Sequence, residues 1–288
     1  MTRNDKSRKM YNTRRRKNFA RVFILAIVSI LIFFIFLLID NEKKELQVSF
    51  FDVGQGDSSL IRTPEGKIIL IDGGPNNLVV RRLGEKLPFY KRKIDLIVIS
   101  HYHDDHILGL IEIMRRYKVN KIIYASETET SSLLDYLLLI AKKEKTESVV
   151  ILKEVQIKLD DYCSIIFINP LSLKIKVNEN NSLIAQLDCK QKKFLFSGDN
   201  GFEVEKALLN SNLDLRANIF KVSHHGSKTS NSIEFLKAVS PDKMVISVGL
   251  NNRFGHPALE ILDIANILEI KVLRTDILGT IDIFSNIP

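Results

Sequence analysis

The chain has 288 residues, enough for one large domain or two small ones, and carries 42 Lys and Arg against 34 Asp and Glu. Nine of the basic residues and one acid lie in residues 1–21, so the rest of the chain has 33 of each and is formally neutral. The formal charge of +8 therefore does not indicate that the chain beyond residue 21 binds nucleic acid.

An apolar segment follows the basic tail. Residues 22–39 form an uncharged run of 18, just long enough to cross a bilayer as a helix. The positive charges before it predict an N-terminus that stays in the cytoplasm. A cleavable signal peptide is the alternative, but its apolar core is shorter and ends at small residues, whereas this run ends at Asp40.

These features predict four segments of a protein that spans the cell membrane once. They are a basic cytoplasmic tail (1–21), an uncleaved transmembrane helix (22–39), a linker (40–45) and a folded domain outside the cytoplasm (46–288). The linker is too short to free the domain from the membrane surface.

The folded segment mixes strands and helices without a Pro- or Ser-rich boundary, which predicts one mixed α/β (α+β) domain. Apolar runs bounded by turn residues predict strands over 46–52, 58–62, 67–71, 95–100, 121–124, 164–168, 183–188, 194–196, 218–222, 244–248, 271–274 and 280–283. Helical periodicity predicts helices over 107–117, 131–143, 202–209, 232–238 and 257–268. Residues 188–193 predict a hairpin, and Pro257 is expected in the first turn of its helix.

The two cysteines, Cys163 and Cys189, each lie in a strand-like run. Two isolated cysteines are no disulfide framework, so two unpaired core thiols are expected. A single bridge is the alternative outside the cytoplasm.

All six histidines lie in three short motifs, which an ordinary scatter of surface histidines would not produce. The first is His101-Tyr102-His103-Asp104-Asp105-His106, directly after the strand 95–100. Imidazole and carboxylate groups are ligands for zinc, iron and manganese. Residues two apart in an extended segment point the same way, so His101 and His103 can bind one ion while Asp105 and His106 face a second. The alternative is a polar loop with a helix-capping Asp.

The order of the motifs resembles that of metallo-β-lactamase-fold hydrolases. Within them, it resembles the extracytoplasmic domain of ComEC-type competence proteins and the phosphorylcholine esterases. The resemblance covers nearly all of 46–288. Its motifs are Phe51–Asp57, Ile71–Gly74, His101–His106, Asn180–Leu183, Ser197–Asp199, Ser223–Ser227, Asn252–Pro257 and Arg274–Asp276. It implies a four-layer αββα sandwich with two divalent ions, zinc or manganese, at one edge.

The resemblance also implies roles for single residues. His101 and His103 would bind the first metal, Asp105 and His106 the second, and Asp199 would bridge the two. The alternative for Asp199 is the N-cap of the helix that follows it. Asp72 would orient the metal loop.

The remaining histidines are assigned by position. Adjacent side chains at a strand end point to opposite faces, so we expect His224 to approach the metals and His225 to face the substrate. Asp105 and His225 are the predicted catalytic residues. His256 is expected to bind the second metal, with a buried capping histidine as the alternative. Asp57 is expected to be structural.

The chain departs from many members of the superfamily in one respect. No histidine lies between His106 and His224, where Asn180, Asn181 and Ser182 occupy part of the stretch. The first metal is then expected to have fewer protein ligands, to bind weakly, or to use His224 instead.

The expected chemistry is hydrolysis by a hydroxide that two metal ions activate, because paired cations lower the pKa of a shared water. The first candidate is a phosphodiesterase, with DNA as a candidate substrate, although the neutral domain argues against binding a phosphate backbone. A phosphoester or phosphorylcholine group on a cell-envelope polymer is the alternative. A catalytically silent metal-binding module is the third. The sequence does not identify a protein partner.

Overall fold

The computed structural model describes residues 3–40, 45–125, 131–173, 182–190 and 192–286. The chain divides into two compact units, Met1–Lys43 and Lys44–Pro288. Each is described by itself.

The first unit is the helix α1 (Arg3–Asp40). Its stretch Arg15–Ile35 is long and apolar enough to cross a membrane, by length and composition. Large apolar side chains such as Phe23 and Phe33 are exposed on it. The predicted span 22–39 lies within this helix, whose apolar residues do not form a single stripe.

The second unit contains two mixed sheets of seven strands each, counted over the described residues. The first has the order β14-β1-β2-β3-β4-β5-β6. Its strands are β1 (Glu45–Phe50), β2 (Ser59–Arg62), β3 (Ile68–Ile71), β4 (Lys93–Ile99), β5 (Lys118–Ala125), β6 (Glu147–Ile151) and β14 (Ile281–Asn286). The second has the order β13-β12-β11-β10-β9-β8-β7. Its strands are β7 (Val155–Lys158), β8 (Ser164–Ile168), β9 (Ile184–Cys189), β10 (Lys192–Phe196), β11 (Ile219–Lys221), β12 (Lys243–Ile246) and β13 (Lys271–Arg274).

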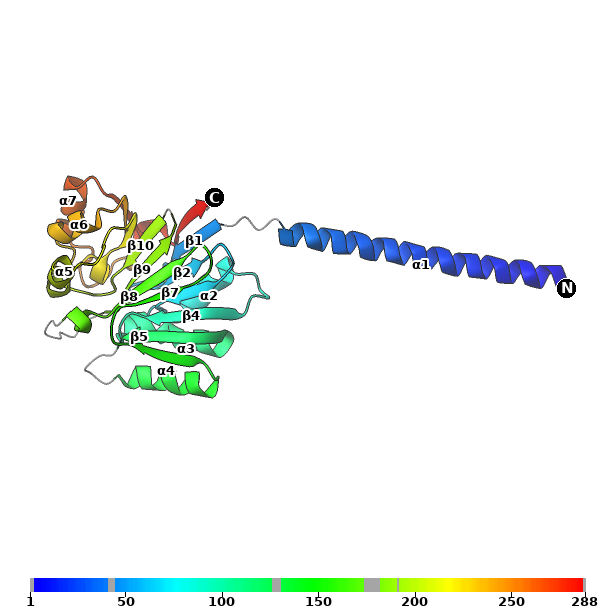
Figure 1. Cartoon of the computed structure of the whole chain (residues 1–288), viewed down its shortest axis with the longest axis horizontal. Coiled ribbons are helices and arrows are strands. Elements are labelled where there is room, and N and C mark those ends of the chain that lie inside the picture. The colour runs from blue at the N-terminus through cyan, green and yellow to red at the C-terminus, as the bar shows by residue number, and fades with distance from the viewer. Residues whose placement is uncertain (1–2, 41–44, 126–130, 174–181, 191, 287–288) are drawn as a thin grey trace. The chain divides into compact units, whose positions relative to one another are not determined.

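Helices cover the outer face of each sheet (Figure 1). Those on the first sheet are α2 (Leu78–Lys86), α3 (Asp104–Arg116) and α4 (Ser132–Lys143). Those on the second are α5 (Phe202–Leu209), α6 (Ile233–Val239) and α7 (Leu259–Ile267). Short turns of helix, η1 (Pro170–Leu173), η2 (Ser223–Gly226) and α8 (Thr275–Leu278), complete the unit.

Three apolar cores hold these layers together. The inner core lies between the sheets, where Phe50 of the first stacks against Phe196 of the second with ring centroids 5.8 Å apart. Each outer core lies between a sheet and its helices, with Leu110 of α3 in one and Phe235 of α6 in the other. Alternate residues of a strand face opposite sides, so a sheet buried on both faces needs apolar residues at nearly every position. The predicted four-layer αββα sandwich is confirmed.

Some elements differ from the prediction. The helix α2 and the strands β6 and β7 were not predicted. Pro257 lies before α7, whose N-cap is Ala258, so the expected place of Pro257 in the first helical turn is wrong. The hairpin predicted over 188–193 is present as the β9–β10 connection.

The expectation of two unpaired thiols is also wrong, because Cys163 and Cys189 form a disulfide. Cys163 directly precedes β8 and Cys189 ends β9, and these neighbouring antiparallel strands pair Ser164 with Asp188. The two cysteines are therefore adjacent across the ladder, a proximity that only the strand register reveals.

Candidate metal centre

The candidate site lies where strand ends of the two sheets meet. Asp72 follows β3 and His101 follows β4; these strands are parallel, so both residues lie at the same edge of the first sheet. Asp199 follows β10, and Ser223 follows β11, which is parallel to β10 in the second sheet. The edges are joined by the backbone N–H of Leu183, which donates to the Ser100 carbonyl at 2.7 Å.

The start of α3 carries the densest part of the first motif. His103 is the N-cap, and Asp105 and His106 lie in the first turn. Two glycines allow the close approaches that hold this turn. A Cβ on Gly56 would lie 2.3 Å from the Asp105 carbonyl oxygen, and one on Gly109 would lie 2.0 Å from the Gly73 oxygen. The motif therefore requires glycine at both places.

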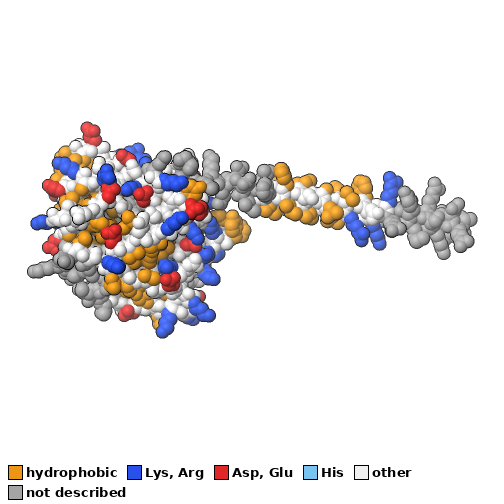
Figure 2. Space-filling model, in the orientation of Figure 1, with side chains coloured by type: hydrophobic (Ala, Val, Ile, Leu, Met, Phe, Trp, Pro, Cys, Tyr) orange, Lys and Arg blue, Asp and Glu red, His pale blue; other side chains and the backbone are white. Residues whose placement is uncertain are grey.

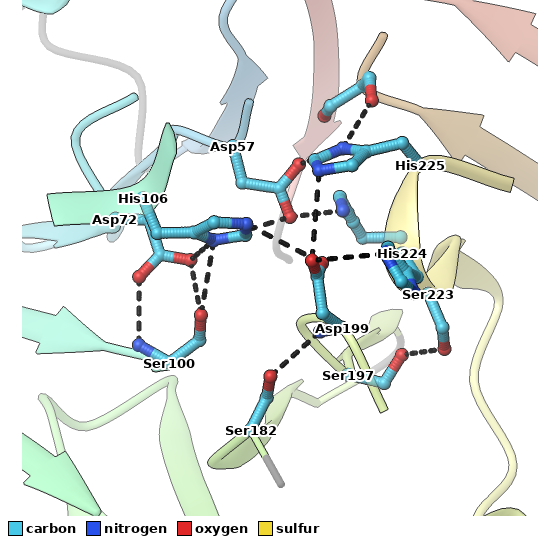
Figure 3. Close-up of polar contacts among 12 residues, drawn as sticks. Asp57, Asp72, Ser100, His106, Ser182, Ser197, Asp199, Ser223, His224 and His225 are labelled. Atoms are coloured by element: carbon cyan, nitrogen blue, oxygen red, sulfur yellow. Dashed lines mark hydrogen bonds and ion pairs between the residues drawn. The ribbon is translucent and has the colours of Figure 1, made fainter. Parts of the chain in front are cut away.

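Asp199 is at the centre of the cluster (Figure 3). Its Oδ1 lies 3.5 Å from Nε2 of His106, and its Oδ2 lies 3.6 Å from Nε2 of His101. The same Oδ2 lies 3.9 Å from Nε2 of His225, which is itself 3.2 Å from Oδ2 of Asp105. Three of the predicted motifs thus meet within one cluster.

The donor atoms of this cluster suit a metal ion. Nε2 of His101, Nε2 of His106 and Oδ1 of Asp199 are buried and make no hydrogen bond to the described residues. Buried polar atoms without a partner are costly, unless a cation binds them. Two sets of atoms within 4.8 Å of one another are His101–His106–Asp199 and Asp105–His106–His225. The residues fit divalent metal ions.

A third set, Asp57–Asp72–His106, has the same spacing but different chemistry. Asp72 already accepts from the backbone N–H of Ser100 at 2.8 Å, from the Ser100 hydroxyl at 2.7 Å and from Nδ1 of His106 at 2.9 Å. These contacts hold the His106 ring so that Nε2 faces Asp199, as is usual for a metal-binding histidine. The expected orienting contacts of Asp72 are present.

Asp57 forms a buried ion pair with Lys221. An ammonium group beside the carboxylate disfavours a cation there. Asp57 also lies 3.3 Å from Nδ1 of His225, so it supports the site from behind. This arrangement agrees with the structural role expected for Asp57.

The paired histidines are arranged differently from the expectation. Both have positive φ, 49° at His224 and 53° at His225, so the backbone turns here and does not continue as a strand. His225 is the buried one, and its Nδ1 lies 2.9 Å from the Ser247 carbonyl oxygen. His224 is partly exposed, with Nε2 3.8 Å from Oδ2 of Asp199. The turn thus brings His225 into the cluster and leaves His224 at its rim.

His103 and His256 lie at the periphery. The His103 side chain is exposed, and its ring centroid lies 4.6 Å from that of His101. The His256 ring lies 5.7 Å from His224, and its buried Nδ1 has no hydrogen-bond partner among the described residues. His256 does not cap α7, which has no side-chain cap. The metal roles expected for both residues stay predictions.

The structure also removes the capping alternative for Asp199. The N-cap of α5 is Gly201, without a side-chain cap bond. Asp199 is instead fixed by its backbone N–H, which donates to the Ser182 hydroxyl at 2.8 Å. Asn180 and Asn181 lie outside the described residues.

The carboxylates and imidazoles of the cluster shift each other's pKa. Burial acts to raise the pKa of Asp199, but His106, His225 and His101 outweigh it and hold that pKa well below its ordinary value. Burial opposes protonation of His225, yet Asp199 and Asp57 raise its pKa to about 9. Burial, followed by the neighbouring His106, holds the pKa of His101 well below its ordinary value. Asp199 is therefore held in the charged form that binding a cation requires.

Sequence reasoning missed several supporting residues. Lys221 is a lone charge in the apolar strand directly before the paired histidines, a signal that marks it. Glu205 of α5 is buried and accepts bonds from the backbone N–H groups of Asn231 and Ser232. Asn231 in turn bonds both backbone groups of Ser223. Nothing in the sequence marks Glu205, because this role depends on tertiary contacts.

Residues 51–249, more than half of the chain, match the model of the metallo-beta-lactamase superfamily. The chain belongs to the metallo-beta-lactamase superfamily. Its fold is similar to that of the metallo-beta-lactamase fold protein YhfI from Bacillus subtilis, with a TM-score of 0.56, 11% identity and coverage of 79% of this chain and 96% of that one. Proteins of this superfamily bind divalent metal ions, in agreement with the His and Asp cluster.

Within the superfamily, the chain is similar to competence proteins. It is 27% identical over 263 residues to ComE operon protein 3 of Bacillus subtilis, covering 83% of this chain and 33% of that protein. It is 28% identical over 245 residues to competence protein ComA of Neisseria gonorrhoeae, covering 83% and 32%. The chain thus spans about a third of the length of these relatives. The predicted resemblance to ComEC-type competence proteins is confirmed.

Proposed function

We propose that this protein is a membrane-anchored, metal-dependent hydrolase that cleaves phosphodiester bonds outside the cytoplasm. The observation that carries the proposal is the convergence of His101, His106 and Asp199, whose buried donor atoms have no hydrogen-bond partner among the described residues. The apolar stretch Arg15–Ile35 of α1 supports the anchor.

Two divalent ions, zinc or manganese, would be held by the two sets of donors. His101 would serve the first ion, and Asp105 and His225 the second. His106 belongs to both sets but offers a single Nε2, so it serves one ion. Asp199 lies between the two sets, with Oδ1 near His106 and Oδ2 near both His101 and His225, and would be shared by the two ions. Such ions supply Lewis acidity, which makes water a stronger nucleophile near neutral pH and neutralises charge on a phosphoryl oxygen.

The remaining chemistry belongs to the chain's own residues. Nδ1 of His225 donates to the Ser247 carbonyl, which leaves the lone pair of Nε2 directed at the cluster. The contact between Nδ1 of His106 and Asp72 does the same for His106. This geometry favours His225 as the ligand, the reverse of the expected order. His224, at the rim, would then bind the substrate or transfer a proton to it.

A nuclease assay tests the proposal. The purified full-length chain, with added Zn²⁺ or Mn²⁺, would be incubated with labelled single-stranded DNA and with a bis-aryl phosphate. We expect cleavage that His106→Ala abolishes and that the exposed-site control Lys237→Ala retains. Equal cleavage by wild type and His106→Ala would show that the activity comes from a contaminant and would overturn the proposal.

A second candidate substrate is a phosphoester or phosphorylcholine group on a cell-envelope polymer. The position of the site favours this substrate. The site lies at the end of β4, and Lys93 lies at the start of the same strand. Lys93 is level with Glu45, where the chain enters the domain. A site at the end of the sheet opposite to Glu45 suits a polymer further out in the envelope. Release of phosphate or phosphorylcholine from purified envelope fractions, without DNA cleavage, would favour this substrate.

A catalytically silent metal-binding module remains the third candidate, because no histidine lies between His106 and His224. Elemental analysis separates it from an enzyme. Less than one ion per chain, together with no hydrolysis after metal addition, would favour the silent module.

A further inference from the structure

Three connections of the first sheet emerge at the end opposite the candidate site. They join α2 to β4, α3 to β5 and α4 to β6. Because β4, β5 and β6 are parallel, these connections all lie where the strands begin, whereas His101 follows the end of β4. About eight residues of extended chain separate Lys93 from His101, which corresponds to roughly 26 Å.

The strand register places these connections level with the point where the chain enters the domain. Gln47 pairs with Arg62, Arg62 with Ile68, and Ile69 with Leu96. Gln47 of β1 is therefore level with Asp95 of β4, and Glu45, two residues before Gln47, is level with Lys93, two residues before Asp95. Three strand spacings separate them, about 14 Å. Only residues 41–44 separate Glu45 from α1, a reach of at most about 17 Å for extended chain.

The three connections are strongly basic. We define the basic rim as residues 86–93, 115–118 and 142–145, which together hold ten Lys and Arg and one acid, Glu144. Lys93 and Lys118 are directly paired across β4 and β5, and both are exposed. Lys142, Lys143 and Lys145 are also exposed and form no ion pair among the described residues. Four of the ten form ion pairs with acids next to the rim: Lys86 with Asp282, Lys93 with Asp95, and Arg115 and Arg116 with Glu112. The other six form no ion pair among the described residues, and Figure 2 shows Lys and Arg side chains interspersed with Asp and Glu over the visible face of the domain.

Two aromatic side chains project from the same rim. Phe89 is 84% exposed and Tyr90 is 72% exposed, with their ring centroids 5.5 Å apart. Pro88 precedes them and Lys91 and Arg92 follow. Exposed aromatic rings flanked by cations are typical of segments that lie at the boundary between lipid headgroups and acyl chains.

We propose that the basic rim is a lipid-binding surface that seats the domain on a bilayer rich in anionic headgroups, with Phe89 and Tyr90 at the interface. This inference rests on the proposed membrane anchor, because the anchor brings the bilayer within reach of Glu45. Cations near an anionic leaflet gain from its negative surface potential, and aromatic rings bury area that is exposed in water. Seated in this way, the domain would carry the candidate metal centre at the end of β4 opposite to the lipid.

Single-stranded nucleic acid also binds surfaces that combine cations and exposed aromatic rings. The structure favours lipid. The rim lies at the opposite end of β4 from His101, and it is level with Glu45, where the chain enters the domain. Nucleic acid bound at the rim would lie at the opposite end of β4 from the site, so the rim would not hold a substrate strand beside His101.

The experiment uses the absence of tryptophan from the chain, which makes Phe89→Trp a unique fluorophore. The full-length variant would be reconstituted into vesicles of phosphatidylcholine alone, or of phosphatidylcholine with phosphatidylglycerol, each with brominated acyl chains as quenchers. Phe254→Trp is the matched control, because Phe254 is 56% exposed in the loop that carries His256. Flotation of the vesicles measures anchoring separately.

We expect the Phe89→Trp emission to shift to the blue and to be quenched at least twofold more than that of Phe254→Trp in vesicles containing phosphatidylglycerol. The substitutions Lys142→Glu, Lys143→Glu and Lys145→Glu together should remove most of that difference without changing flotation. A chain that floats but shows equal quenching at both positions would overturn this inference alone. A chain that does not float would overturn the anchor as well. Quenching of Phe89→Trp by single-stranded DNA, but not by lipid, would assign the rim to nucleic acid instead.

Discussion

Asp199 is the residue around which the donor atoms of the site converge. Its two oxygens lie 3.5 Å and 3.6 Å from the Nε2 atoms of His106 and His101. The carboxylate is buried, and its charge is stabilised by the imidazoles around it. A shared anion is what two neighbouring cations need, because it reduces their mutual repulsion.

Asp199→Ala should therefore abolish activity, and Asp199→Asn should fail nearly as badly, because the amide keeps the shape but not the charge. The measurements are metal content and rate of phosphodiester cleavage for both variants beside wild type. Serving as matched control, Asp263→Asn changes a carboxylate of α7 outside the site and should retain both properties. An Asn variant that keeps its metal and its rate would contradict the bridging role.

The pair of Lys221 and Asp57 is a second buried feature of the site. Removing one partner of a buried ion pair leaves an uncompensated charge, so Lys221→Met should lower the free energy of unfolding by about 3–5 kcal/mol. Denaturant titration of the full-length chain measures this loss. The exposed Lys237→Met should change the free energy by less than about 0.5 kcal/mol.

A second variant keeps this prediction distinct from a general packing defect. Adding Asp57→Asn to Lys221→Met removes both charges and should recover part of the lost stability. A double variant that is no more stable than Lys221→Met would show that the unpaired charge of Asp57 is not the cause of the loss.

The residues that the sequence could reveal are those at the ends of predictable strands. His101, His106 and Asp199 follow recognisable apolar runs, so their meeting at one edge was foreseeable. The order of His224 and His225 was not, because a strand continued through them would alternate, whereas the chain enters left-handed geometry at both. Which of two adjacent side chains faces inward depends on that turn, which single-sequence patterns do not specify.

Among the secondary-structure elements, the strongly buried ones were predictable and the peripheral ones were not. The strand β4 is almost wholly apolar because it is buried on both faces. The strands β6 and β7 are at sheet edges with largely exposed side chains, so their apolar pattern is weak. The helix α2 has apolar residues at helical spacing, with Val79 and Leu83 buried, but Gly84 lowers its helix propensity.

The helix α5 has a function that its own sequence does not show. Glu205 accepts bonds from Asn231 and Ser232, and Asn231 holds Ser223, the first residue of the turn that carries His224 and His225. The helix thus fixes a turn that lies 18 residues further along the chain.

Glu205→Gln should weaken this support. The substitution replaces one carboxylate oxygen by an amide nitrogen, which is a donor and cannot accept a hydrogen bond from the backbone N–H groups of Asn231 or Ser232. The expected loss of stability is about 1–3 kcal/mol. Because the turn would be less well held, kcat should fall more than KM changes. Glu234→Gln, an exposed residue of α6, is the matched control. Equal kinetics for both variants would show that α5 does not position the histidines.

At the scale of the whole molecule, the disulfide and the apolar helix concern the same question, the compartment of the domain. Disulfides persist outside the cytoplasm and are rare inside it.

The bridge between Cys163 and Cys189 closes a segment with a sequence separation of 26 residues. Reduction, or the double change Cys163→Ala and Cys189→Ala, should lower the free energy of unfolding by about 2–5 kcal/mol. A thiol reductant that shifts the melting temperature of wild type but not of the double variant would identify the bridge as the cause; no shift in wild type would contradict it.

The last prediction concerns the side of the membrane on which the domain lies. Nine positive charges precede the uncharged run 22–39, and such charges are retained in the cytoplasm, so the domain from residue 46 onward should lie outside. Protease added to intact protoplasts should therefore degrade the domain and leave an N-terminal tag protected until lysis. A cytoplasmic protein, degraded only after lysis, serves as the control for intact membranes. If the domain itself were protected until lysis, the outer location would be wrong. The neutral domain and its cluster of candidate metal ligands would then be better matched to a small phosphodiester in the cytoplasm, such as a signalling nucleotide, than to a polymer of the envelope.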